Sequence, residues 1–137
     1  MECKLLDKED IELMKKFIDD ENTNYEEEKL VQFLNERNSC GFILKYENEI
    51  IGFAYGYILV RPDGKKDFYL HSIDIMKKHQ GNGYGTKLMN FIKKYINTIG
   101  CRKMFLITNK SNQSACKCYE KSGGINNADD EIVYVYK

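Results

Sequence analysis

The N-terminal part of the chain changes from a helical to a strand-like pattern of apolar positions. Apolar side chains recur every three or four residues within positions 8–20 and again within 25–37, which predicts two amphipathic helices. Residues 41–46 and 50–61 are instead rich in aromatic and β-branched side chains, with Asn48 in a turn position between them. This pattern predicts a β-hairpin after the two helices.

The second strand of this hairpin has one large and one small face. The large side chains share one face and are Ile51, Phe53, Tyr55, Tyr57 and Leu59. The small residues share the other face and are Gly52, Ala54 and Gly56. A small face lets another part of the protein come close, and close packing is expected here rather than contact with a substrate. A turn at residues 62–64 then leads to a third predicted strand over 68–76.

The second half of the chain alternates helices with short strands. Helical spacing of apolar residues follows the glycine-rich residues 81–85 and ends at Gly100. Residues 104–108 are predicted to form a strand, 111–122 a helix, and 131–136 a closing strand whose apolar side chains alternate. The order of elements predicts the α/β class, with a mixed, mostly antiparallel central sheet flanked by helices.

Length and composition limit the classes of protein to which the chain can belong. The 137 residues are expected to form a single domain, residues 1–137, and the net charge of +0 gives no general attraction to nucleic acid. The N-terminus lacks the basic and apolar regions of an export signal, and no apolar run is long enough to span a membrane. Five cysteines without a CxxC pair or a histidine at metal-ligand spacing favour reduced thiols. We therefore expect a cytoplasmic protein with no metal site and with no nucleic-acid or membrane partner.

Three glycines alternate at the start of the long helix, at positions 81, 83 and 85. Their spacing differs from both the dinucleotide-binding and the P-loop patterns. Glycines before a helix let successive backbone N–H groups converge, and the helix dipole favours a negative charge there by roughly 0.3–1 kcal/mol. The turn therefore either binds an anion such as a diphosphate or only caps the helix.

Two segments around this turn resemble a known family. Residues 73–88 resemble motif A of the GNAT superfamily of acyl-CoA-dependent N-acetyltransferases, with Gln80, Gly83 and Gly85 at the positions of its Q/R-x-x-G-x-G/A signature. Residues 112–123 are similar to motif B of the same superfamily, N-x-x-A-x-x-x-Y-E-K-x-G. The two motifs occur at a family-like separation, which favours anion binding over simple capping.

The resemblance covers residues 49–124, and residues 67–75 look like the gentamicin-type aminoglycoside N-acetyltransferases of this superfamily. It implies an acyltransferase that moves an acetyl group from acetyl-CoA to a primary amine of a small molecule or peptide by direct transfer. The partners implied are acetyl-CoA as co-substrate, the amine and, as a possible assembly, a second copy in a homodimer. The identity of the amine stays open.

The resemblance also implies roles for residues of both motifs. The turn from Gln80 to Gly85 would hold the diphosphate, and Asn112 would contact the pantetheine arm or begin a helix. The sheet of such a fold is splayed, so the backbone N–H groups of residues 73–75 would face the thioester carbonyl. The cofactor-binding residues expected are Ile73, Asp74, Ile75, Gln80, Gly81, Asn82, Gly83, Tyr84, Gly85, Thr86 and Asn112.

Two catalytic residues are expected, a proton donor and a base. The resemblance makes Tyr119 the donor to the departing CoA thiolate. An alkylammonium with a pKa near 10.4 is almost fully protonated at pH 7, so the amine needs a proton acceptor. The candidate base is His71, acting through water, because an imidazole titrates near neutral pH. Tyr69, Asp74 and the carboxylates of residues 26–28 are the alternatives.

The choice of His71 rests on strand alternation. One face of the third strand is expected to carry Tyr69, His71, Ile73 and Ile75. The other face is expected to carry Leu70, Ser72 and Asp74, unless a β-bulge changes the parity. The second histidine, His79, lies in the turn before the glycines and is expected at the surface.

A second class of protein competes with the enzyme. A catalytically idle acyl-CoA-binding or sensing module would keep Gln80 to Gly85 but would not need His71 or Tyr119. Both side chains are present, which favours the enzyme. A nucleotide-binding domain is excluded, because no Lys-Ser/Thr pair follows the glycines as the P-loop requires.

Overall fold

The computed structural model describes residues 1–20 and 26–137 of the chain. The strands of this part form one sheet in the order β1-β2-β3-β4-β5, and their bounds are β1 (Glu2–Leu5), β2 (Ser39–Tyr46), β3 (Glu49–Val60), β4 (Lys66–Ile75) and β5 (Cys101–Phe105). The helices are η1 (Lys8–Asp10), α1 (Ile11–Asp20), α2 (Glu27–Asn35), η2 (Lys77–His79), α3 (Tyr84–Thr98) and α4 (Gln113–Lys121). All strand pairs are antiparallel except β4 and β5, so the fold is the mixed, mostly antiparallel α/β fold that the sequence predicts.

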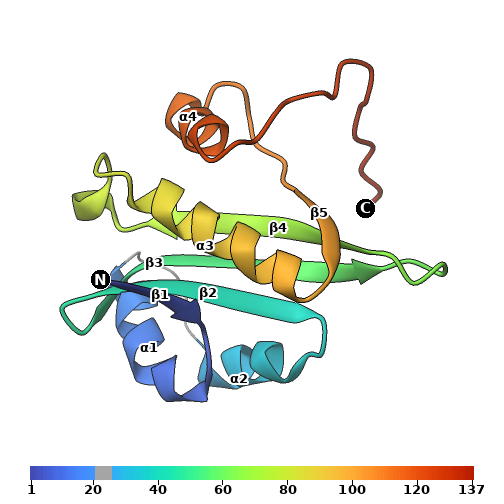
Figure 1. The fold of residues 1–137 in the computed structure, drawn as a ribbon. Helices are drawn as coiled ribbons and strands as arrows, with labels where there is room; N and C mark the ends of the chain where they lie inside the picture. Colours follow the sequence, from blue (N-terminus) through green and yellow to red (C-terminus); the bar gives the residue numbers. More distant parts are fainter. Residues whose placement is uncertain (21–25) are drawn as a thin grey trace.

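Helices cover both faces of the sheet. α1 and α2 lie against one face and α3 crosses the other, with α4 beside α3 (Figure 1). Two hydrophobic cores follow from this arrangement, one around Met14 and Ile51 under α1 and one around Phe42, Phe68 and Leu88 under α3. Within the described residues, no helix combines the length and the apolar character needed to cross a bilayer.

The N-terminal predictions are confirmed. Both helices form, although residue 25, which the pattern includes in the second one, lies outside the described residues. The hairpin of β2 and β3 turns at Glu47 and Asn48, whose φ angles of 49° and 64° match the left-handed conformation that a two-residue hairpin turn requires. In β3 the large face packs on α1 and α2, whereas Ala54 belongs to the core under α3.

Three predictions about strands need correction. Residues 2–5 form a strand, β1, which the pattern did not indicate because it is short and pairs with the distant β2. The strand predicted at 104–108 begins earlier, at Cys101, and ends at Phe105. The closing strand predicted over 131–136 is wrong, since this segment pairs with no strand of the described part. Alternating apolar residues indicate that a segment can form a strand, but a strand also needs a partner.

A bulge in β4 overturns the predicted parity of this strand. Tyr55 of β3 is opposite Ser72, but the next residue, Gly56, is opposite Leu70, so β4 contains one extra residue at this point. Consequently Ile73 and Ile75 join Leu70 in the core under α3. His71 lies on the opposite face with Tyr69, and Asp74 follows them there instead of sharing a face with Leu70.

Gly56 makes this bulge sterically feasible. A Cβ atom on Gly56 would lie 2.2 Å from the backbone oxygen of Tyr69 and 2.7 Å from the Phe68 ring. No residue with a side chain fits at that distance without moving β4. The small face of β3 is therefore explained by close packing, as expected.

Candidate active site

The glycine turn before α3 is open on its outer side. Gly81 and Gly83 have φ angles of +81° and +79°, and a Cβ atom on either would meet nothing within 4 Å. Gly83 is the N-cap of α3, so the first backbone N–H groups of that helix have no partner inside it. These free donors and the positive end of the helix dipole make the turn suited to an anion.

Polar side chains brace the turn from inside. The Gln80 amide nitrogen donates a hydrogen bond to the backbone oxygen of Ile75 at 2.9 Å, which ties the turn to the end of β4. The Asn82 amide donates to the backbone oxygens of His79 and Gln80 at 3.2 and 3.4 Å. Gln80 and Asn82 thus hold the backbone in a conformation that leaves its N–H groups exposed.

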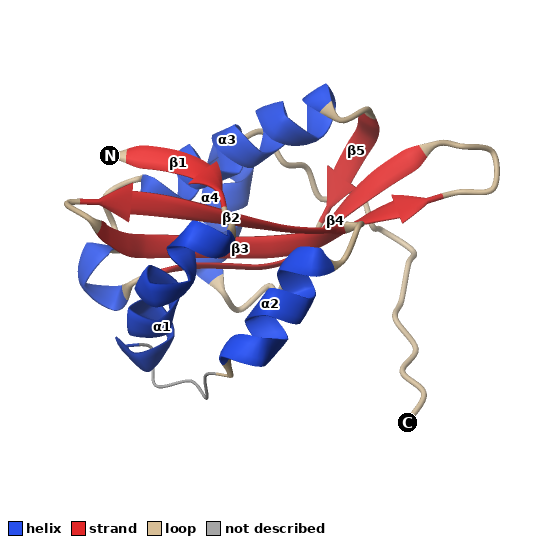
Figure 2. Ribbon diagram, turned by 90° about the horizontal axis from the view of Figure 1, so that it is seen from below, coloured by secondary structure: helices blue, strands red, loops and turns tan. Residues whose placement is uncertain are grey.

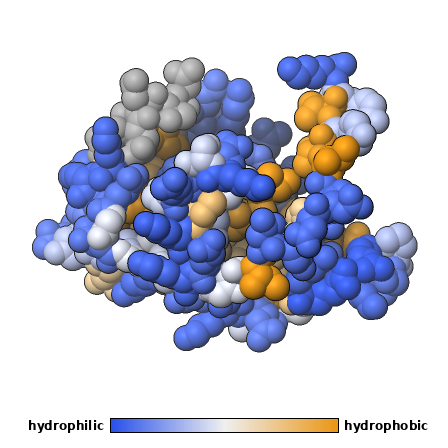
Figure 3. Space-filling model, turned by 90° about the horizontal axis from the view of Figure 1, so that it is seen from above, coloured by the Kyte–Doolittle hydropathy of each residue, from blue (hydrophilic) through white to orange (hydrophobic). Residues whose placement is uncertain are grey.

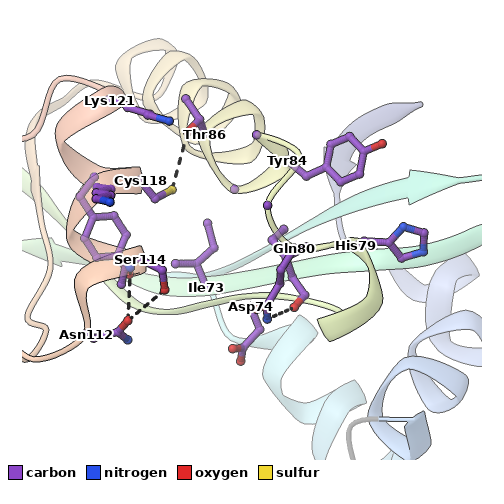
Figure 4. Close-up of a pocket in the computed structure, with 17 residues that line it drawn as sticks. Ile73, Asp74, His79, Gln80, Tyr84, Thr86, Asn112, Ser114, Cys118 and Lys121 are labelled. Carbon is purple, nitrogen blue, oxygen red and sulfur yellow. Dashed lines mark hydrogen bonds between the residues drawn. The ribbon is translucent and has the colours of Figure 1, made fainter.

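A pocket of about 390 Å³ extends from this turn to α4 (Figure 4). Its walls come from the end of β4, the turn and the start of α3, and α4. The lining residues are Ile73, Asp74, Ile75, His79, Gln80, Gly81, Gly83, Tyr84, Gly85, Thr86, Asn112, Ser114, Ala115, Lys117, Cys118, Tyr119 and Lys121.

Most of the expected site residues lie in this pocket. The structure brings together Tyr119 with all the expected cofactor-binding residues except Asn82, which supports the turn from behind. His71 does not line it. Asn112 begins α4, because its side-chain oxygen accepts hydrogen bonds from the backbone N–H of Ala115 and the hydroxyl of Ser114.

The sheet splits beside the pocket. β4 pairs with β5 only from Lys66 to Tyr69, and the rest of β4 continues without β5. The end of β4, including Ile73–Ile75, therefore has an open edge where the pocket lies. Backbone groups on an open strand edge can hydrogen-bond a ligand instead of a neighbouring strand.

Tyr119 lies half-buried in the pocket wall. Burial raises the pKa of its phenol above the usual range, and Cys118 and Asp74 nearby add to this increase. The phenol is therefore protonated throughout the neutral range. It can donate a proton or a hydrogen bond to a group inside the pocket.

His71 is exposed and belongs to a group of aromatic rings on the α1 and α2 face, whose tyrosines are partly buried. Its imidazole stacks on Tyr55 with ring centres 5.2 Å apart and lies edge-on to Tyr57 and Tyr69. Burial raises the pKa of the Tyr55 phenol, and Tyr57, Tyr69 and Asp74 raise it further. Asp74 therefore lies on the same face as His71 and also reaches the pocket.

Among the other candidate bases, Tyr69 stacks on Phe105 at 5.1 Å, and residues 26–28 are exposed at the start of α2. None of them lines the pocket. Asp74 is thus the alternative that the structure brings nearest to Tyr119.

Several lining residues were not expected from the sequence. Two lysines lie one helical turn apart on α4, Lys117 and Lys121, and they bring two positive charges to the pocket. Their i,i+4 spacing is a visible signal, but it gains meaning only once α4 lies beside the glycine turn. His79, expected at the surface, is partly buried and also lines the pocket.

Cys118 is a further unexpected lining residue. Its sulfur accepts a hydrogen bond from the Thr86 hydroxyl at 3.9 Å, and it lies 3.0 Å from the position of a Cβ atom on Gly85 (Figure 4). Gly85 therefore allows α3 and α4 to approach. This contact joins α3 and α4 in the pocket lining.

Comparison with known proteins shows the family to which the chain belongs. A sequence model of the Acetyltransferase (GNAT) family matches residues 10–124, and the chain therefore belongs to this family of acyltransferases. None of the curated proteins compared with the chain matches it.

Solved structures share the fold over nearly the whole chain. An aminoglycoside acetyltransferase, meta-AAC0020, from an uncultured soil metagenomic sample has a TM-score of 0.82 and 21% identity, covering 99% of this chain and 94% of that one. A ribosomal-protein-alanine N-acetyltransferase from Brucella melitensis biovar Abortus 2308 has a TM-score of 0.79 and 18% identity, covering 99% and 98%. The aminoglycoside N-acetyltransferase AAC(6')-Iy, in complex with CoA, has a TM-score of 0.79 and 17% identity over the same shares.

Proposed function

We propose that the chain is an acetyl-CoA-dependent N-acetyltransferase that acts on a primary amine of a small molecule or peptide. The observation that carries the proposal is the single pocket that joins an open glycine turn to Tyr119. One end suits a diphosphate and the other offers a proton donor. A pocket with both ends fits a long thioester that must be held and then cleaved.

The residues present fit acetyl-CoA. The backbone from Gln80 to Thr86 would bind the diphosphate at the start of α3, and Lys117 and Lys121 add positive charge from α4. The open edge at Ile73–Ile75 would hydrogen-bond the pantetheine arm and the thioester oxygen. The bound thioester supplies the activated acetyl group.

In the proposed transfer, the amine nitrogen bonds to the acetyl carbon as the bond from that carbon to sulfur breaks. The Tyr119 hydroxyl donates a hydrogen bond or its proton to the departing sulfur, and the second proton, which the nitrogen loses as the amide forms, goes to the thiolate or restores the Tyr119 hydroxyl. The ammonium proton of the amine leaves through water to His71, which lies on the same face of β4 as Asp74. Asp74 is the alternative acceptor.

The class of amine is supported by the related structures. The names of two of them specify aminoglycosides and the name of a third specifies a ribosomal-protein alanine, so both a small molecule and a peptide belong in a substrate panel. We further propose that residues 1–137 act as one domain, in the cytoplasm and without a metal. Five cysteines without a CxxC pair support a reducing compartment.

The proposal is tested by following thiol release from acetyl-CoA in the presence of an aminoglycoside, a polyamine, an amino acid and an alanine-ended peptide. We expect thiol release that depends on at least one amine, persists with a chelator, and is matched by a mass gain of one acetyl group on that amine. Binding of acetyl-CoA without turnover on any amine would instead support an idle acyl-CoA-binding module.

Direct transfer has its own kinetic test. We expect initial-rate lines that intersect when both substrates are varied, because both must be bound together. Cys118 is the thiol that a covalent route would use, since it lines the pocket. Parallel lines together with loss of turnover in Cys118→Ser would contradict direct transfer.

A further inference from the structure

Three tyrosines surround the His71 imidazole on the face of the sheet that carries α1 and α2. The ring centres of Tyr55, Tyr57 and Tyr69 lie 5.2, 6.3 and 5.6 Å from that of His71, and we call these three side chains the tyrosine group. Figure 2 looks onto this face, where α1 and α2 lie across the strands and β5 lies to one side of α2. Because His71 is exposed and the tyrosines are only partly buried, the group is open to solvent.

The hydroxyls of the tyrosine group have no structural role. Within residues 1–20 and 26–137, none of them hydrogen-bonds to another protein group. Burial raises the pKa of the Tyr55 phenol, so this hydroxyl stays neutral at physiological pH. A partly buried hydroxyl without a protein partner can accept a hydrogen bond from a ligand, and the ring face beside it attracts a cation.

Asp74 connects the tyrosine group to the pocket that it lines. Besides burial, its carboxylate raises the pKa of both the Tyr55 and the Tyr119 phenol, so it lies near both side chains. Because three strand steps separate Asp74 from His71, the two residues are at most about 10 Å apart along β4. A linear molecule can therefore reach from the pocket at Tyr119 to the tyrosine group.

Negative charge on this face favours a cationic ligand. α2 packs on the tyrosine group through Phe33, whose ring lies edge-on to Tyr55 at 5.9 Å. The helix begins with exposed carboxylates at residues 26–28, and Lys29 offsets one of them through an ion pair. α2 therefore brings net negative charge to the face on which Asp74 lies, and this charge is complementary to a cation.

The α4 side of the molecule carries positive charge at the pocket instead. Its surface is mostly hydrophilic (Figure 3), and Lys117 and Lys121 on α4 line the pocket. These lysines suit an anionic co-substrate and repel a cation. A cationic acceptor is therefore favoured to approach the pocket from the tyrosine group.

We propose that the tyrosine group binds the second ammonium of a linear diamine while the first amino group is acetylated. This substrate class rests on the acetyl transfer proposed above. The second ammonium would contact the ring faces and donate hydrogen bonds to the phenol oxygens. The alkyl chain would lie along β4 past Asp74, so that the first amino group meets the thioester at the open strand edge.

Two acceptors with the same carbon chain test the proposal, 1,8-diaminooctane and octylamine, which differ only in the second amino group. We expect kcat/KM for acetylation to be at least about tenfold higher for the diamine, chiefly through a lower KM. Equal values, or a preference for octylamine, would show an apolar site and would overturn the proposal. This comparison needs no variant, so it does not depend on whether a substituted protein folds.

Tyr57 has no assigned role in the proton transfers, so it is the position to substitute. Tyr57→Leu should remove most of the preference for the diamine, whereas Tyr57→Phe keeps the ring face and should retain most of it. The matched control is Tyr134→Leu, since Tyr134 is 74% exposed and lies outside the tyrosine group. The preference should be unchanged in this control. A full preference in a folded Tyr57→Leu, as judged by circular dichroism, would contradict the role of the ring.

Calorimetry separates this proposal from the acetyl transfer itself. The diamine is titrated into the protein saturated with CoA, which has no acetyl group to transfer. Binding that Tyr57→Leu weakens about tenfold, without thiol release from acetyl-CoA, would support the cation site and contradict the acetyl transfer. Acetylation of octylamine with no advantage for the diamine would support the acetyl transfer and contradict the cation site.

Discussion

Tyr119 has a half-buried aromatic ring and a hydroxyl group that can reach a ligand in the pocket. Replacing it with Phe keeps the ring and removes only the hydroxyl. We expect kcat for thiol release to fall by roughly 10–10³-fold with acetyl-CoA affinity nearly unchanged. Rate measurements and calorimetry on Tyr119→Phe check this.

The matched control for Tyr119→Phe is Tyr95→Phe. Burial raises the pKa of the Tyr95 phenol as well, but Tyr95 lies on α3, packs against Phe42 in the core and does not line the pocket. The kcat of Tyr95→Phe should therefore equal that of the unsubstituted protein. Equal effects in the two variants would assign a structural role to the Tyr119 hydroxyl.

A single side chain is also expected to accept the proton of the substrate amine. An imidazole accepts a proton only when neutral, so with His71 as base kcat/KM should rise as increasing pH removes the proton from this side chain. His71→Ala should remove this rise and lower the plateau, whereas Asp74→Asn should keep it. A second rise above about pH 8 should move when an amine of different pKa is used. Persistence of the first rise in His71→Ala would make Asp74 the next candidate.

The glycine turn affects both stability and binding, because it begins α3 and also faces the pocket. Gly83→Ala and Gly64→Ala introduce the same methyl group at φ angles of +79° and +83°, each with nothing within 4 Å. Both should lose roughly 1–2 kcal/mol of stability from backbone strain. Only Gly83→Ala should weaken acetyl-CoA binding, by about tenfold or more, which calorimetry would show.

The bulge in β4 can be tested through the strand beside it. A Cβ atom on Gly56 would lie 2.2 Å from the Tyr69 backbone oxygen. One on Gly52 would lie 2.7 Å from the flexible end of Ile75 and 3.3 Å from the Cβ atom of Leu44, and no closer than 3.6 Å to any backbone atom. Gly56→Ala should therefore reduce the free energy of unfolding by roughly 1–3 kcal/mol, and Gly52→Ala by less. Urea denaturation of both variants provides the comparison, and equal losses would contradict the steric role of Gly56.

Elements whose signals are local in sequence could be predicted, and those that depend on distant partners could not. The glycine turn, Asn48 in the hairpin and the cap at Asn112 carry their geometry in adjacent residues. The bulge requires Gly56 and Tyr69 on different strands, so alternation alone assigned Ile73 to the wrong face. Likewise, the lysines of α4 become pocket residues only through packing.

At the scale of the whole molecule, buried thiols couple stability to pH. Burial, reinforced by Cys101, raises the pKa of the Cys40 thiol from 9.0 to about 11. Between these values the unfolded chain binds fewer protons than the folded chain, so stability falls as pH rises. The loss from this group is on the order of 3 kcal/mol and is complete above about pH 11. Urea midpoints should decrease less steeply over this range in Cys40→Ala; identical slopes would contradict the assignment.

The contacts that hold α4 against α3 affect the stability of the whole molecule. α4 has no fully buried side chain, and its polar ties to α3 include the bond from Lys93 to the Ser122 carbonyl oxygen and the one from Thr86 to Cys118. A ligand that spans the pocket would contact both α4 and the glycine turn and would therefore raise the melting temperature of the protein.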